Sequence, residues 1–322
     1  MPTMMRVLVT GAAGFVGSHL AQALKRACGD DALVRATSKT AGQHPDYGPV
    51  SALDIEDAAA VAQAIQDHAP THVIHLAGIA APSAANANPR LAWNVHLGGA
   101  LNLGEAILRH APACHLLHVG TGLVYGATAK SGQPLSEDAL LAPTDGYAAS
   151  KAAADLALGA MNQQGLKCIR LRPFNHSGLG QSDAFVIPAF ARQIAEIEAG
   201  LSPPQLRVGN LDAERDFLDV RDVARAYILA MLRADTLEAG AILNIASGMP
   251  RRIGDVLETL LTQAKVKIEV VSDPARMRPS DLPRIVGDAK RAENILGWSP
   301  QHGFSDMIQV VLDDWRTRTT VR

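Results

Sequence analysis

The residues with the clearest chemical potential are Tyr147 and Lys151, which stand four positions apart in the segment YAASK. Four positions make about one helical turn, so the phenol and the ammonium group share one helix face. A phenol titrates near pH 10, and a neighbouring ammonium favours its ionised form, which would let Tyr147 give or take a proton near neutral pH. Thr121 offers a hydroxyl just after an apolar segment at 116–119. The phenol and the ammonium group suit acid–base chemistry, and the Thr121 hydroxyl stands at the strand end where open parallel sheets bind ligands.

A glycine-rich segment is the second chemical signal. Gly11, Gly14 and Gly17 follow the apolar residues 7–9 and precede a helical pattern that begins at Ser18. A strand, a glycine-rich turn and a helix in this order predict a dinucleotide site, with the pyrophosphate at the helix N-terminus. The spacing is GxxGxxG rather than GxGxxG, and a glycine-rich turn without a ligand is the alternative.

The second predicted strand ends without the carboxylate that usually holds a ribose 2′-hydroxyl. The chain instead reads Arg35-Ala36-Thr37-Ser38-Lys39. A carboxylate would repel a 2′-phosphate, so its absence favours NADP(H) and permits NAD(H). The alternative is that Lys39 lies on a solvated loop. Asp54 and Ile55 suit adenine recognition, unless Asp54 caps a helix that begins near Glu56.

Strand and helix patterns alternate through the first half of the chain. This predicts βαβ units and an α/β fold of the Rossmann type, a doubly wound parallel sheet with a smaller C-terminal substrate-binding lobe. We expect a dinucleotide-binding domain at 1–175, to which parts of 216–248 return, and a substrate lobe at 176–322. Buried strands are predicted at 7–9, 33–36, 73–76, 116–119 and 168–171, and helices at 18–27, 58–69, 91–109 and 148–161.

Composition excludes several classes of function. The 322 residues carry 30 Lys+Arg against 32 Asp+Glu, a net charge of −2, so we expect no nucleic-acid partner. We also expect no membrane association, because no run approaches the roughly 20 apolar residues of a spanning helix. His72 and His75 would point to opposite faces of a strand, so no metal site is predicted. The three cysteines lack metal-site spacing, and a cytoplasmic location is expected.

Taken together, the motifs resemble the extended short-chain dehydrogenase/reductase family of nucleotide-sugar epimerases, dehydratases and reductases. The resemblance covers nearly the whole chain, and its motifs come in the family's order. They are TGAAGFVG at 10–17, Asp54-Ile55, HLAG at 75–78, Asn94 in NVHLGG, GTGLVYG at 120–126, YAASK at 147–151, RPFN at 172–175 and RDFLDVRDV at 215–223.

The resemblance implies a role for each site residue. Thr121 polarises the sugar oxygen, Tyr147 transfers the proton, and Lys151 holds the nicotinamide ribose and tunes the tyrosine. Substrate contacts are implied for Thr121, Asn175, Arg215 and Arg278, although Asp216 and Asp219 could instead form a surface ion cluster with Arg215. Cofactor contacts are implied for Gly11, Gly14, Phe15, Val16, Gly17, Ser38, Lys39, Asp54, Ile55, Leu76, Ala77, Gly78, Tyr147, Lys151 and Pro173.

The type of reaction follows from departures within the family. Dehydratases place Asp-Glu or Ser-Glu after the threonine, whereas Gly122 and Leu123 cannot exchange protons. The segment from Arg172 to Gln181 is similar to GDP-4-dehydro-6-deoxy-D-mannose reductases, although Leu179 stands where those enzymes usually have proline. We therefore expect an NAD(P)H-dependent reductase of the C4 ketone of a nucleotide-diphosphate 4-keto-6-deoxyhexose, with the GDP-linked mannose derivative as first candidate.

Two other functions stay open at this point. A nucleotide-sugar 4-epimerase would use the same three residues with a tightly bound NAD. A dinucleotide-sensing regulator without enzyme activity would need none of them. The predicted helices at 91–109 and 148–161 carry apolar residues on more than one face, and the family pairs these helices between subunits, so a homodimer is expected.

Overall fold

A central sheet of eight strands organises the protein, whose structure is a computed structural model that describes residues 4–277 and 282–320. The strand order is β11-β7-β6-β5-β1-β2-β4-β3, and every neighbouring pair is parallel except β3 with β4. The strands are β1 (Met5–Thr10), β2 (Ala32–Ser38), β3 (Gly42–His44), β4 (Gly48–Ala52), β5 (His72–His75), β6 (His115–Val119), β7 (Lys167–Pro173) and β11 (Ile242–Ile245). The order reverses beside β1, which defines the switch point where such sheets bind ligands.

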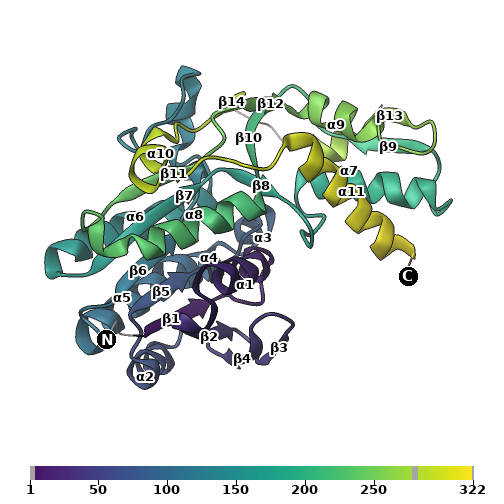
Figure 1. Cartoon of the computed structure of the whole chain (residues 1–322). Helices are drawn as coiled ribbons and strands as arrows, with labels where there is room; N and C mark the ends of the chain where they lie inside the picture. The colour runs from purple at the N-terminus through teal and green to yellow at the C-terminus, as the bar shows by residue number, and fades with distance from the viewer. Residues whose placement is uncertain (1–3, 278–281, 321–322) are drawn as a thin grey trace.

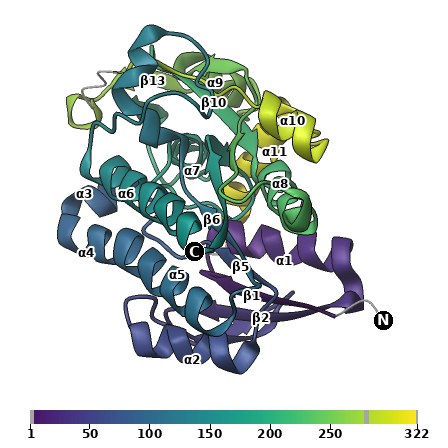
Figure 2. The ribbon, with the colours of Figure 1, turned by 90° about the vertical axis from the view of Figure 1, so that its left-hand side faces the viewer.

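Helices cover both faces of this sheet (Figures 1 and 2). Helices α1 (Phe15–Cys28) and α8 (Val220–Leu232) pack together on one face, with α10 (Lys290–Leu296) beside α8. On the opposite face lie α2 (Ala58–His68), α5 (Gly99–His110) and α6 (Gly146–Met161). The predicted doubly wound fold is confirmed.

The predicted helix at 91–109 is not uniform. It comprises α4 (Pro89–Trp93), a π-helical segment (Asn94–Gly98) and α5, and the short helix α3 (Pro82–Ala87) precedes it. A π turn inserts one extra residue into the helical ladder, a feature that is frequent at functional sites. Here the π segment contributes His96, which points toward α6.

Short strands and three helices form the remaining part of the fold, on the right in Figure 1. One four-stranded sheet contains β8 (Asn175–Ser177), β10 (Glu214–Asp219), β12 (Pro250–Arg252) and β14 (Arg284–Ile285), and β9 (Gln205–Val208) pairs with β13 (Glu269–Ser272). Their apolar side chains pack with α7 (Val186–Glu198), α9 (Ile253–Leu261) and α11 (Phe304–Thr320) around a separate core. Short 3-10 segments lie at Gly29–Asp31, Gly122–Ser131, Asn162–Gln164, Ala234–Thr236 and Pro274–Arg276.

Candidate active site

The three predicted catalytic side chains come together where β6 ends. Thr121 is the second residue after β6, and Tyr147 and Lys151 lie in the first turns of α6. All three side chains are buried, and the Thr121 hydroxyl accepts a hydrogen bond from the Leu123 amide at 3.2 Å. Two side chains fix the start of α6: Asp145 accepts a hydrogen bond from the Ala148 amide at 2.7 Å, and Asn86 of α3 accepts one from the Tyr147 amide at 2.9 Å.

Burial sets the proton affinity of Tyr147. It raises the pKa of the phenol to about 12, and the nearby Thr121 side chain opposes that shift. The sequence predicted that the Lys151 ammonium favours the phenolate, but desolvation of the buried phenol is the largest influence on its pKa. Tyr147 therefore keeps its proton at neutral pH and is suited to donate it.

Lys151 is held against the end of β6. Its Nζ donates a hydrogen bond to the Val119 carbonyl oxygen at 2.8 Å, which directs the ammonium to the carboxyl edge of the sheet. Burial lowers the pKa of Lys151 to about 8, and the charge of Asp155 one turn further along α6 opposes that shift. The lysine is therefore mostly charged at neutral pH and can stabilise a tyrosinate formed beside it.

His96 was missed by the sequence reasoning. Its Nε2 accepts a hydrogen bond from the Ile79 amide at 3.0 Å, and its Nδ1 contacts the Ser150 hydroxyl oxygen at 2.8 Å. Ser150 in turn donates to the Tyr147 carbonyl oxygen at 2.9 Å, and the His96 ring meets the Tyr147 ring edge-on. Burial lowers the pKa of His96 to about 4, so a neutral imidazole links the π segment to α6. The only sequence signal near this contact is that His96 lies in the NVHLGG segment quoted for the resemblance.

Asp155 was also missed, although it continues the helix face of Tyr147 and Lys151. Its carboxylate is fully buried and accepts two hydrogen bonds from Arg172, at 2.9 and 2.8 Å, and one from Arg170 at 3.0 Å. The two arginines alternate along β7, so their side chains share one face of the sheet. This ion cluster joins α6 to β7 directly below the catalytic pair.

The glycine segment forms a cradle that side chains would fill. A Cβ added to Gly11 would lie 2.6 Å from the Ala77 amide nitrogen, and one added to Gly17 would lie 2.3 Å from the Ala12 carbonyl oxygen. The loop Leu76–Ala77–Gly78 after β5 therefore lies directly beside the turn before α1. Backbone amides at the start of α1 face this edge, which fits a dinucleotide pyrophosphate.

Lys39 lies just past the end of β2 and has two carboxylate partners at the surface. It forms ion pairs with Asp54 at 3.2 Å and with Glu56 at 3.6 Å, and its side chain is 69% exposed, which agrees with the alternative of a solvated loop residue. Asp54 does not cap α2, because that helix begins at Ala58 and is capped by Asp57. Asp54 instead accepts a hydrogen bond from the Glu56 amide at 3.0 Å and remains near the cofactor edge.

Arg35 is not placed to contact a 2′-phosphate. It lies in the middle of β2, paired in register with Leu8, about 10 Å of strand before Ser38. Its charge acts on His68 at the end of α2. Ser38 and Lys39 are therefore the polar groups that the end of β2 offers.

Two of the four predicted substrate contacts, Asn175 and Arg215, lie on the second sheet. Asn175 of β8 is in register with Phe217 of β10, two residues from Arg215, whose Nη1 donates to the Glu214 carbonyl oxygen at 2.7 Å. The alternative ion cluster is wrong for both aspartates. Asp216 accepts hydrogen bonds from the amides of Ser247, Gly248 and Gly287, and Asp219 pairs with Arg221 at 2.6 Å. Arg278 lies outside the described residues.

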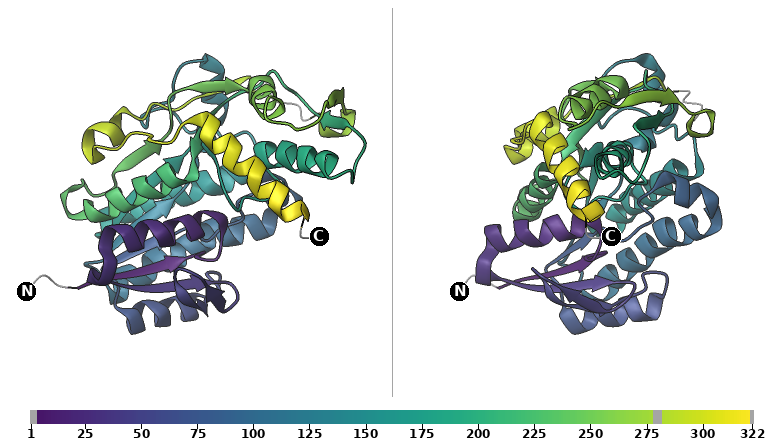
Figure 3. Two further views of the ribbon diagram at one scale, coloured as in Figure 1. Left: turned by 45° about the vertical axis from the view of Figure 1, so that its right-hand side comes forward. Right: turned by 90° about the vertical axis from the view of Figure 1, so that its right-hand side faces the viewer.

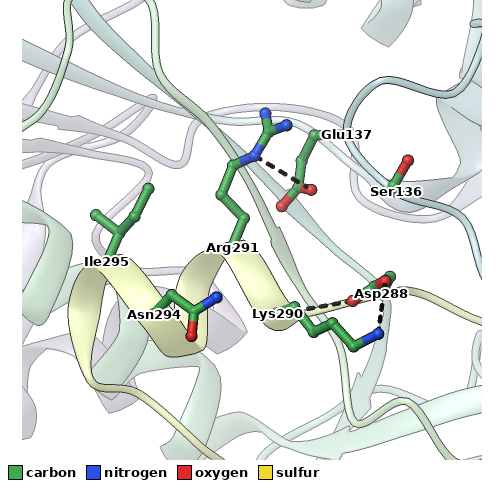
Figure 4. A pocket seen from close by; sticks show the side chains of 7 residues that line it. All are labelled: Ser136, Glu137, Asp288, Lys290, Arg291, Asn294 and Ile295. Carbon is green, nitrogen blue, oxygen red and sulfur yellow. Dashed lines mark hydrogen bonds and ion pairs between the residues drawn. The ribbon is translucent and has the colours of Figure 1, made fainter.

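Outside the catalytic site, the described residues form a cavity but no metal site and no membrane-spanning helix. A cavity of about 360 Å³ near α10 contains none of the catalytic residues (Figure 4). Charged side chains line it and pair with one another, Arg291 with Glu137 and Lys290 with Asp288. In residues 4–277 and 282–320, no three His, Cys, Asp or Glu side chains gather as a metal site, and no helix is long and apolar enough to cross a membrane.

The sheet order, the glycine cradle and the Thr-Tyr-Lys arrangement together define an extended short-chain dehydrogenase/reductase. The chain belongs to the family described as GDP-mannose 4,6 dehydratase, whose model matches residues 8–311. The recognition from sequence is confirmed, as is the prediction that the chain is an NAD(P)-dependent enzyme of this type.

The proteins similar to this chain include both reductases and epimerases. The chain is 36% identical to a GDP-6-deoxy-D-mannose reductase from Pseudomonas aeruginosa over 97% of this chain and 98% of that protein. It is similar to the structure of RMD from the same organism complexed with NADPH, with a TM-score of 0.85, 33% identity, and coverage of 98% and 99% of the two chains. A UDP-glucose 4-epimerase from Thermus thermophilus complexed with NAD gives a TM-score of 0.82 at 32% identity, over 97% and 99%.

Proposed function

We propose that this protein reduces the C4 ketone of a nucleotide-diphosphate 4-keto-6-deoxyhexose with NADPH, and that the GDP-linked mannose derivative is its substrate. The observation that carries the proposal is the arrangement of three buried side chains at the carboxyl end of β6. Thr121 lies just past that strand, and Tyr147 and Lys151 share one face of α6, with the Lys151 Nζ bound to the Val119 carbonyl oxygen at 2.8 Å. Reduction of a ketone needs a proton donor at this position. The similarity to the Pseudomonas aeruginosa reductase supports the sugar.

The chemistry divides among the three side chains. Bound NADPH supplies the hydride for C4. The Thr121 hydroxyl orients and polarises the C4 oxygen, and the Tyr147 phenol donates its proton to that oxygen as negative charge develops. The Lys151 ammonium stabilises the tyrosinate that remains, because opposite charges in a buried site interact strongly. His96 and Ser150 hold the first turn of α6 in place through the Tyr147 carbonyl oxygen.

The preference for NADPH rests on the end of β2. No carboxylate stands at Ser38 or Lys39, and the Lys39 ammonium is about two-thirds exposed beside Asp54 and Glu56. A ribose 2′-phosphate would draw Lys39 away from these carboxylates, whereas NAD would leave the pairs intact. The relative complexed with NADPH is consistent with this preference.

A dehydratase reaction fits the site poorly, despite the description of the matching family. Eliminating water from the sugar needs an extra acid and base after the threonine. At that point a Cβ on Gly122 would lie 2.9 Å from the Phe174 ring, so no side chain fits. Leu123 cannot exchange protons. The family model therefore describes the fold and the cofactor class rather than this reaction.

An epimerase is the second candidate, because epimerases share the fold and nearly a third of the residues. The discriminating experiment measures the fate of the cofactor. A reductase is purified largely free of dinucleotide and consumes NADPH in a one-to-one ratio with a GDP-linked 4-keto sugar. Retention of NAD, with interconversion of two nucleotide hexoses and no net cofactor consumption, would establish the epimerase instead.

Substitution of Tyr147 tests the proton donor. Tyr147→Phe keeps the ring and removes only the hydroxyl, so we expect NADPH affinity to persist while kcat falls by roughly 10²–10⁴. Thr121→Val serves as a matched variant that should also lower kcat with little effect on NADPH affinity. Near-full activity of Tyr147→Phe would show that another group donates the proton.

The division into a dinucleotide-binding domain at 1–175 and a substrate lobe at 176–322 remains part of this proposal, with β11 and α8 returning to the first domain. We also propose a homodimer. Leu91 and Trp93 of α4 and Leu156 of α6 are large apolar side chains on the same flank, each at least 36% exposed. Burial of these side chains against a second copy would remove them from water.

A further inference from the structure

The C-terminal helix α11 reaches the loop that lies over the glycine segment. We propose that Arg318 and Asp314 of α11 are positioning residues for dinucleotide binding, because they hold residues 176–181 against the start of α1. The inference rests on the proposed dinucleotide site but not on the identity of the sugar. Figure 3 shows the last turns of α11, in yellow, directed toward the side of the molecule where α1 lies.

Two hydrogen bonds within residues 176–181 tie this segment together. The Ser177 hydroxyl donates to Gln181 Oε1 at 2.6 Å, and Gln181 Nε2 donates to the His176 carbonyl oxygen at 2.9 Å. Gly180 has a φ of +92°, a conformation that side chains disfavour. The segment 176–181, which begins in β8, is therefore held together by its own hydrogen bonds between its contacts with α1 and α11.

One side of the loop packs on the first turns of α1. The His176 ring stacks on the Phe15 ring at 6.1 Å with an interplanar angle of 5°. His19 contacts the Leu179 carbonyl oxygen through Nε2 at 2.8 Å. Gly178 fits closely here, since a Cβ would lie 2.5 Å from a Val220 methyl carbon. Phe15 follows Gly14 directly, so the loop fixes the residue whose backbone begins the phosphate-binding helix.

The other side of the loop is bound by α11. Asp314 accepts a hydrogen bond from the Gly180 amide at 3.1 Å. Arg318 pairs with both oxygens of Asp314, at 3.1 and 2.6 Å, and its Nη1 donates to the Gln181 carbonyl oxygen at 3.2 Å. The guanidinium also lies over the Trp315 ring at 4.9 Å. The Asp314 carboxylate thus binds the Gly180 amide, and Arg318 binds both that carboxylate and the Gln181 carbonyl oxygen. We call these contacts of Asp314 and Arg318 the clasp.

These contacts couple two regions far apart in the sequence. Trp315 belongs to the core around α7, α9 and α11, so the clasp joins that core to the cofactor edge of the main sheet. Among the described residues, none of the contacts of Asp314 and Arg318 involves Ser38 or Lys39 at the end of β2, where the 2′-phosphate that distinguishes NADP from NAD would lie. Its contribution should therefore act on the pyrophosphate, which both dinucleotides share.

The test measures dinucleotide affinity without any sugar. Wild type, Arg318→Ala and Asp314→Asn are titrated with NADPH and with NADH, followed by nucleotide fluorescence. We expect each variant to raise Kd about tenfold, the scale of one or two lost charge-assisted hydrogen bonds, by the same factor for both dinucleotides. In turnover the effect appears in KM for NADPH rather than in kcat. Arg318→Lys, which keeps the charge near Asp314, should recover part of the affinity.

Arg316→Ala is the matched control. Arg316 stands on the same helix, is 17% exposed against 34% for Arg318, and pairs with Glu198 of α7 at 2.8 Å, so its loss disturbs the second core without touching the loop. Its Kd values should stay within twofold of wild type. Clasp variants that fold and bind both dinucleotides like wild type overturn the inference, as does an equal loss in Arg316→Ala. Failure of the wild type to bind either dinucleotide would instead overturn the proposed function, and the inference with it.

Discussion

Asp155 forms a buried ion cluster with Arg170 and Arg172, and its charge also acts on Lys151 of the active site. The carboxylate is fully buried, and the side chains of Arg172 and Arg170 that it binds are 3% and 13% exposed. Asp155→Asn keeps the shape of the side chain but leaves two guanidinium groups buried without a counter-charge. Breaking one partner of a buried ion pair costs about 3–5 kcal/mol in unfolding free energy. For a chain of 322 residues that corresponds to a fall in Tm of roughly 4–7 °C.

The same substitution should change the pH dependence of catalysis. The Asp155 charge stabilises the Lys151 ammonium, so its removal moves the Lys151 pKa below its present value of about 8. Activity requires the charged lysine and is lost as pH rises through that pKa. We therefore expect the descending limb of the kcat profile to begin at lower pH in Asp155→Asn than in wild type.

Asp138→Asn supplies the matched comparison. Asp138 pairs with Arg291 at 2.8 Å, but its side chain is 80% exposed, so the same chemical change should cost at most about 1 kcal/mol. Urea unfolding and kcat between pH 6 and 9 measure both effects. Equal stability losses in the two variants would refute the burial argument, and an unmoved or higher descending limb in Asp155→Asn would refute the electrostatic one.

Three further predictions concern the cradle, acid stability and assembly. Gly17→Ala should weaken NADPH binding by more than about tenfold, because its methyl group would meet the Ala12 carbonyl, whereas Gly98→Ala, with open space around it, should not. Burial lowers the pKa of both His72 and His96 to about 4, so the native state resists their protonation. Unfolding free energy should thus be fully retained above pH 6.5 and fall toward pH 4, by up to roughly 3 kcal/mol for each histidine in urea titrations. Light scattering should give a dimer mass for wild type and a lower mass for Leu156→Glu; a monomeric wild type would exclude the proposed homodimer.

The local patterns of the sequence predicted the features that depend on neighbouring residues. Glycines three apart between a strand and a helix determine a cradle, because the backbone there must approach Ala12 and Ala77 too closely for side chains. Tyr147 and Lys151 share a face because four residues make a helical turn. Thr121 follows a strand whose carboxyl end lies at the ligand edge of a parallel sheet. Each of these inferences used only the spacing of residues and the order of strands and helices along the chain.

The tertiary structure alone decided the energies of those groups and their distant partners. Tyr147 holds its proton because the surrounding elements exclude water, which no local pattern reports. Arg35 lies three residues before the end of β2, because its register with Leu8 sets its position along the strand. The pairing of Asp155 with β7, and of Asp314 with the Gly180 amide 134 residues away, depends on how separate elements pack. Burial and long-range contact are properties of the folded chain, so sequence spacing cannot specify them.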